Sequence, residues 1–206
     1  MINKNPKNGR KHKMKYILMR HANDNVLDDL FYQIRDLACK NGVVLDKESI
    51  LERMASLTID SRDAYVHNEV KEIVRQREER HKEFQREHPG VQIRLLPNVL
   101  AETAKRINQR IEGQPLTIAY NDTLRTEFTA RAIARVTGGN LISGKLLEAN
   151  QVSHWMRNNK DYEGLSVIVT HEPAICGLLG FSEIKYCGAY FISRVENGII
   201  KEFQEV

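Results

Sequence analysis

The sequence predicts a three-layer α/β/α sandwich with a mostly parallel sheet. Short apolar stretches alternate along the chain with segments whose apolar residues recur at helical spacing. The strongest apolar stretches, residues 16–19, 116–120 and 165–170, are continuous, which is typical of strands covered on both faces. Strands that alternate with helices favour a parallel sheet with helices on both of its faces.

The first of these strands ends abruptly at Arg20 and His21, which small polar residues follow. In open α/β sheets the carboxyl ends of the strands are where ligands bind. A neutral imidazole has a lone pair that can attack phosphorus, and a guanidinium offers a planar pair of donors to phosphate oxygens. The strand end is therefore a candidate site for phosphoryl chemistry.

A helical insertion is predicted after this strand, over residues 26–94, which contain no comparable strand pattern. One amphipathic helix ends near Gly42, and a second, capped by Asp46, covers residues 47–55. A third, over residues 63–88, is highly charged and carries a thin apolar stripe. That stripe indicates a solvated surface helix, with a lid over the site or an oligomer interface as the alternatives.

The rest of the chain returns to the alternating pattern. A helix around residues 100–111 precedes the second strand, and Asn121 is predicted to cap the helix that carries Arg125. The further predicted elements are a strand at residues 140–143, a helix around Trp155, the strand at residues 165–170 that ends on His171, a helix at residues 173–179, and a hairpin of residues 189–194 and 199–203 joined by Asn197 and Gly198.

The composition and the charge distribution limit the classes of protein to which this chain can belong. The chain has 206 residues and a net charge of +4, but six basic residues and no acidic ones lie in its first 15 positions. We expect a basic flexible tail over residues 1–13 and a single α/β domain over residues 14–206, with nucleic acid contacted only through the tail. The absence of long apolar stretches predicts a cytoplasmic protein without membrane contacts, and the widely spaced Cys39, Cys176 and Cys187 favour reduced thiols.

Three predicted strand ends present cationic or imidazole side chains: Arg20 with His21, Arg125, and His171. The motif from Leu18 to Ala22 resembles the L-x-R-H-G signature of the histidine phosphatase superfamily, which has the phosphoglycerate mutase-like fold. The segment of residues 121–130 is similar to the S-x-x-x-R-A-x-x-T-A helix start of that family, and residues 167–172 to its strand ending in Ser or Thr before His. The C-terminal half most resembles small bacterial phosphohistidine phosphatases.

The resemblance implies that His21 is the nucleophile that becomes phosphorylated. It also implies that Arg20, Arg125 and His171 bind the transferred phosphoryl group, together with Asn23. No metal ion and no cofactor is expected, because a loose phosphoryl transition state can be stabilised by fixed positive donors around it.

A phosphate ester also requires a proton donor for its leaving group. Glu148, which follows Leu146 and Leu147, occupies the stretch comparable to the acidic L-x-E segment of the family, while Glu172 and Asp24 are the alternatives. Two departures from the family pattern stand out. Ala22 replaces a glycine, which is tolerable where φ is negative, and Asn121 replaces a serine.

The function predicted from these motifs is that of a metal-independent phosphohydrolase acting through a phosphohistidine on a phosphate ester or a phosphorylated protein. The alternative is a non-catalytic phosphate-binding or scaffolding module that uses the charged helical insertion. A metal hydrolase with His21 and His171 as ligands would need a His spacing that the sequence does not contain.

Overall fold

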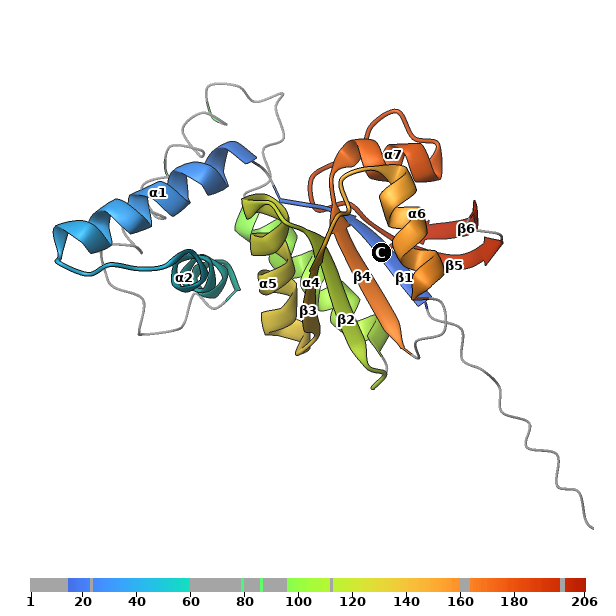
Figure 1. Ribbon diagram of the computed structural model, residues 1–206, viewed down its shortest axis with the longest axis horizontal. Coiled ribbons are helices and arrows are strands. Elements are labelled where there is room, and N and C mark those ends of the chain that lie inside the picture. Colours follow the sequence, from blue (N-terminus) through green and yellow to red (C-terminus); the bar gives the residue numbers. More distant parts are fainter. Residues whose placement is uncertain are drawn as a thin grey trace, which may run out of the picture.

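The sheet of this protein has six strands in the order β3-β2-β4-β1-β5-β6. The computed structural model describes residues 15–22, 24–59, 79, 86, 96–111, 113–159, 164–196 and 199–206. Helices pack on both faces of the sheet, so the fold is the three-layer α/β/α sandwich predicted from the sequence (Figure 1).

Each predicted strand is present. The strands are β1 (Lys15–Arg20), β2 (Leu116–Asn121), β3 (Asn140–Gly144), β4 (Leu165–Thr170), β5 (Ala189–Glu196) and β6 (Ile199–Glu205). The pairs β3–β2, β2–β4 and β4–β1 are parallel, whereas β1–β5 and β5–β6 are antiparallel. The sheet is therefore mostly parallel, with an antiparallel edge formed by the predicted hairpin, whose turn residues Asn197 and Gly198 lie outside the described residues.

The two central strands, β1 and β4, are buried because their side chains pack into the cores on both faces of the sheet. In β1, Ile17 and Met19 belong to the core on one face, and Leu18 belongs to the core on the other. All six residues of β4 are buried. This alternation follows from the period of two in a strand, and it explains why these strands read as continuous apolar sequence.

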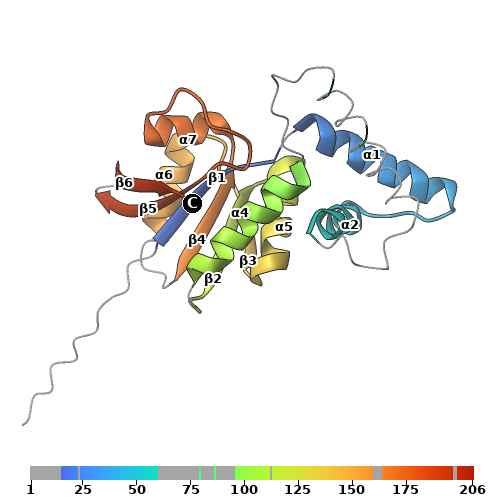
Figure 2. The ribbon, with the colours of Figure 1, turned by 180° about the vertical axis from the view of Figure 1, so that it is seen from behind.

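Helices α4 (Leu96–Ile111) and α5 (Leu124–Thr137) contribute to one core, and α6 (Ala149–Asn158) and α7 (Glu172–Leu179) contribute to the other. Figure 2 shows α4 and α5 from behind, on the face opposite α6 and α7. Helix α5 is followed by Gly138, whose φ of 69° is left-handed and whose N–H is donated to the carbonyl of Ala134, as in a typical glycine cap. Within the described part of the chain, no helix is long and apolar enough to cross a membrane.

Two further helices, α1 (Asp24–Lys40) and α2 (Lys47–Ile59), follow β1 and lie beyond α5 from the sheet (Figure 1). The predicted cap of α2 is confirmed, because the Asp46 Oδ1 accepts the N–H of Ser49 at 2.7 Å. Helix α2 buries Ile50, Leu51 and Met54 in the same core as α4 and α5, and thereby adds an outer layer to that face.

Some predictions fall on residues that are not described. The basic tail of residues 1–13 lies outside the described residues, as does the predicted helix of residues 63–88 apart from Glu79 and Arg86. The boundaries of the helical insertion therefore stay a prediction.

One expectation about α5 is wrong. The residue before the helix is Thr123, and the side chain of Asn121 does not cap it. Asn121 is the last residue of β2, and its Oδ1 accepts the N–H of Leu146 at 3.1 Å, in the connection between β3 and α6. The amide therefore links the end of β2 to the connection that follows β3.

Candidate active site

The predicted histidine pair comes together at the carboxyl edge of the sheet. Strands β1 and β4 are parallel neighbours with Arg20 opposite Thr170, so the next residues, His21 and His171, lie side by side. Their ring centroids are 4.7 Å apart, and the ring planes are inclined at 66°. The N–H of His21 is donated to the carbonyl of Thr170 at 3.0 Å, which continues the ladder to the point where the two rings meet.

A backbone carbonyl defines the tautomer of His21. The residue is almost wholly buried, with 3% of its surface exposed, and Nδ1 lies 2.5 Å from the carbonyl oxygen of Ala22. A carbonyl oxygen only accepts, so Nδ1 carries the hydrogen in this contact, and in the neutral ring the lone pair is then on Nε2. A neutral imidazole held in this way has the electronic form that a nucleophile requires.

Ala22, the residue after His21, is tied to the helix that carries Arg125. The N–H of Ala22 is donated to the Thr129 hydroxyl at 3.0 Å, and that hydroxyl is donated to the carbonyl of Arg125 at 2.7 Å. The first turn of α5, where Arg125 is partly buried, is thus held against the end of β1. Ala22 is fully buried and does not have a positive φ, so the predicted condition for replacing glycine is met.

The guanidinium of Arg20 contacts several groups of the protein. Its Nη2 lies 3.0 Å from Glu172 Oε2, its Nη1 is donated to the carbonyl of Ile184, and its Cζ sits 3.8 Å from the centroid of the Tyr186 ring. Among the described residues its Nε is buried without a hydrogen-bond partner. The Nε–H of Arg20 therefore has no acceptor among the described residues, while Nη1 and Nη2 are each engaged in one contact with the protein.

Glu172 is the first residue of α7 and bridges two segments. Besides Arg20, it accepts the N–H of Ile184 on Oε1 at 3.0 Å. Both carboxylate oxygens of Glu172 are thus engaged within the protein. Glu148 remains the candidate proton donor.

Glu148 lies at the start of α6 and is exposed. Its N–H and that of Leu147 are donated to the Gln151 side chain at 3.0 and 2.9 Å, so the segment is fixed to the first turn of the helix. Asn23 lies outside the described residues. Asp24 begins α1, but its side chain is not among those described.

Sequence reasoning missed the segment that precedes β5. Tyr186 is 36% exposed, and its ring centroid lies 6.0 Å from that of His21. The next residue, Cys187, has a φ of 58° and donates its N–H to the carbonyl of His21 at 3.4 Å. This stretch contains no recognisable motif, and only the pairing of β5 with β1 brings it to the site.

Two helix N-termini also face this edge of the sheet. Helix α5 begins just after β2, and α7 begins directly after β4, with His171 as the residue before its first turn. The N-terminus of a helix carries partial positive charge and free N–H groups, so both termini favour an anion. Together with the neighbouring cationic side chains, the edge is chemically suited to a phosphoryl group.

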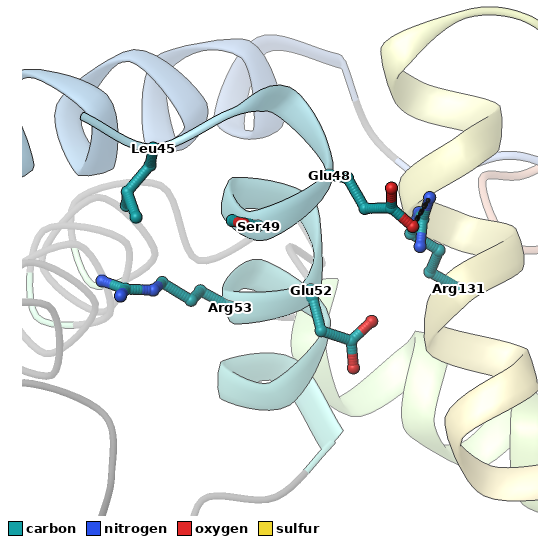
Figure 3. Close-up of a pocket in the computed structure, with 6 residues that line it drawn as sticks. All are labelled: Leu45, Glu48, Ser49, Glu52, Arg53 and Arg131. Carbon is teal, nitrogen blue, oxygen red and sulfur yellow. Dashed lines mark hydrogen bonds and ion pairs between the residues drawn. The ribbon is translucent and has the colours of Figure 1, made fainter.

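A separate pocket of about 410 Å³ lies between α2 and α5, away from these strand ends (Figure 3). The residues that line it are Leu45, Glu48, Ser49, Glu52, Arg53 and Arg131. Glu48 and Arg131 point toward each other across it, and their charged atoms are 3.2 Å apart. Arg131 also pairs with the buried Glu127 at 3.1 Å, so its charge is neutralised within the protein.

The fold and the site define an α/β/α protein with a paired-histidine site at the carboxyl edge of a mostly parallel sheet. No family model matches the chain, and no curated protein matches it in sequence. Among solved structures the chain is similar to the putative phosphohistidine phosphatase SixA from Agrobacterium tumefaciens, with 11% sequence identity, a TM-score of 0.42, and coverage of 93% of this chain and 94% of that chain. A similarity of this degree carries no functional argument, and function is inferred from the site.

Proposed function

We propose that this protein is a metal-independent phosphohydrolase that works through a phosphohistidine on His21. The observation that carries the proposal is the contact between the His21 and His171 rings at the ends of adjacent parallel strands. The hydrogen bond from His21 Nδ1 to the carbonyl of Ala22 supports it, because that bond leaves the lone pair on Nε2.

In the first step, the lone pair of His21 Nε2 forms a bond to phosphorus. The bond between phosphorus and the ester oxygen breaks, and its electron pair stays on that oxygen, which takes a proton from the carboxyl group of Glu148. In the second step, the Glu148 carboxylate takes a proton from water. The water oxygen bonds to phosphorus, and the electron pair of the P–N bond returns to Nε2 as phosphate leaves.

Charge stabilisation is assigned to groups beside the nucleophile. Arg125, His171 and the N-termini of α5 and α7 are proposed to bind the equatorial oxygens of the transferred phosphoryl group. Arg20 is proposed to contribute through its Nε–H, while its other two nitrogens contact Glu172 and Ile184. Fixed donors of this kind require no reorganisation as negative charge shifts in the transition state.

Both substrate classes predicted from the sequence belong to this proposal. A phosphate ester and a phosphorylated protein each present a dianionic group to the same edge of the sheet. We propose a single domain from residue 14 to residue 206, in which the insertion of residues 26–94 begins at the rim of the site, since it leaves β1 just after His21.

The test is turnover of p-nitrophenyl phosphate with and without EDTA, combined with a search for a phosphoenzyme. We expect EDTA-resistant turnover and an acid-labile, base-stable phosphoryl label in the wild-type protein, both lost in His21→Ala. His154→Ala is the matched control, because His154 is an exposed histidine on α6 whose ring contacts Asn158. Full activity of His21→Ala would refute the mechanism.

The alternative function, a phosphate-binding or scaffolding module without turnover, makes a different prediction in the same experiment. Inorganic phosphate would then protect the protein against thermal unfolding in an Arg125-dependent manner, without any label on His21. EDTA-sensitive turnover would instead indicate a metal hydrolase.

A further inference from the structure

The peptide of Leu146 is held from both sides by side chains at strand ends. Its N–H is donated to Asn121 Oδ1 at 3.1 Å, and its carbonyl accepts the hydroxyl of Thr170. The Leu146 side chain is fully buried among residues of β4, α6 and α7. One residue of a surface connection is thus fixed by both of its backbone polar groups and by its side chain.

The two residues that hold it lie at neighbouring strand ends of the sheet. Asn121 and Thr170 are the last residues of β2 and β4, which are parallel neighbours, and both are buried. Thr170 directly precedes His171, and its carbonyl accepts the N–H of His21 at 3.0 Å. The end of β4, which places His171 and binds His21, therefore also helps to place Leu146.

From Leu146 the chain reaches Glu148 in two residues, where Gln151 holds the backbone again. A segment this short, fixed at both ends, leaves Glu148 little freedom of position relative to His171. We propose that Thr170 and Asn121 are positioning residues for Glu148 and keep its carboxyl group at the leaving-group side of the site. This inference rests on the proposed phosphohydrolase function and extends it to residues that do not touch the substrate.

The leaving group distinguishes this role from a merely structural one. An alkyl phosphate releases a strongly basic alkoxide, which needs the proton from Glu148 as the P–O bond breaks, whereas p-nitrophenolate is a weak base and leaves without it. Misplacing the acid should therefore lower kcat/KM for an alkyl phosphate more than for p-nitrophenyl phosphate. The ratio of the two kcat/KM values reports the position of the acid and cancels general damage to the site.

The central variant is Thr170→Val, which removes the hydroxyl donor while keeping the shape of the side chain. We expect the alkyl-to-aryl ratio, measured with β-glycerophosphate and p-nitrophenyl phosphate, to fall by at least about tenfold, the order of loss that follows a small misplacement of a catalytic group. Thr170→Ser keeps the donor and should restore the ratio. Ser166→Ala is the matched control, because Ser166 is also fully buried on β4 and its hydroxyl has no hydrogen-bond partner among the described residues.

Glu148→Gln should lower the same ratio, and adding Thr170→Val to it should lower the ratio little further, because both changes remove one function. If Thr170→Val does not fold, as judged by circular dichroism, Asn121→Ala tests the hydrogen bond on the other side of the Leu146 peptide. An unchanged ratio in a folded Thr170→Val or Asn121→Ala protein, with a lowered ratio in Glu148→Gln, would overturn the positioning role alone. If the wild-type protein shows neither turnover nor a phosphoryl label on His21, the proposed function is overturned as well.

Discussion

The carboxylate of Glu172 lies 3.0 Å from Arg20 Nη2, and the same side chain accepts the N–H of Ile184. This ion pair joins the end of β1 to α7 and to the segment that leads into β5. Its side chains are 12% and 28% exposed, so the charges are partly removed from water and are poorly screened. The pair therefore differs from the ion pairs on the outer surface of the protein.

Replacing Glu172 with Gln should lower the free energy of unfolding by about 1–3 kcal/mol, since the amide keeps one hydrogen bond but leaves the Arg20 charge without a counterion. Urea unfolding followed by circular dichroism measures the change. Glu202→Gln is the control, because its partner Arg194 is exposed and such a pair contributes only about 0–1 kcal/mol. Equal losses in the two variants would mean that burial adds nothing to the Arg20–Glu172 pair.

Arg125→Lys should impair catalysis severely, because a point charge cannot reproduce two coplanar N–H donors to phosphoryl oxygens. The expected cost is about 2–4 kcal/mol in transition-state binding, comparable with the loss of one oxyanion donor. The measurement is kcat/KM for p-nitrophenyl phosphate, with the exposed Arg157→Lys on α6 as control. A change below about threefold in Arg125→Lys would place this arginine outside the site.

Helix α2 should prove integral to the fold and not a detachable lid. Leu51 is fully buried in the core shared with α4 and α5, and Lys47 lies 2.6 Å from the buried carboxylate of Glu127. We expect Leu51→Ala to reduce the free energy of unfolding by about 2–5 kcal/mol, as for other large core truncations. The control is Val44→Ala, whose side chain is 90% exposed. Similar stability of the two variants in urea would show that α2 contributes little to the core.

The buried thiol of Cys187 should make stability fall at alkaline pH. Burial raises its pKa from 9.0 to about 12. Between these values the unfolded chain loses the thiol proton and the folded chain keeps it, so the stability from this group is complete below pH 9.0 and declines toward about pH 12. Cys187→Ala should weaken this decline relative to wild type in unfolding measurements across that range, whereas a variant of the exposed Cys39 should not. An identical pH dependence in wild type and Cys187→Ala would contradict the buried-thiol assignment.

Much of the fold was predictable because its strands are locally distinctive. The apolar stretches that became β1, β2 and β4 are buried on both faces, and a strand of that kind carries its signature in a few consecutive residues. The cap at Asp46 was predictable for a similar reason, since a helix cap is satisfied within a few residues along the chain.

The environment of the predicted site residues was less predictable. Arg20 was expected as a phosphate ligand, yet two of its nitrogens contact Glu172 and Ile184, and a ring from Tyr186 covers its guanidinium. Asn121 was expected to cap a helix but holds the peptide of Leu146. Apart from Glu172, which begins α7, these partners lie in connections between elements, where the residue pattern does not indicate which strand end is near.

The sequence by itself determined the α/β/α class, the succession of strands and helices, and the presence of Arg20, His21 and His171 at strand ends, because periodicity and local residue preference act over short distances along the chain. Only the tertiary structure decided that β4 lies between β1 and β2. That order places the two imidazoles in contact and makes Thr170 a common partner of His21 and Leu146. The physical reason is that strand order is set by how two cores pack on opposite faces of one sheet, which depends on the whole chain at once.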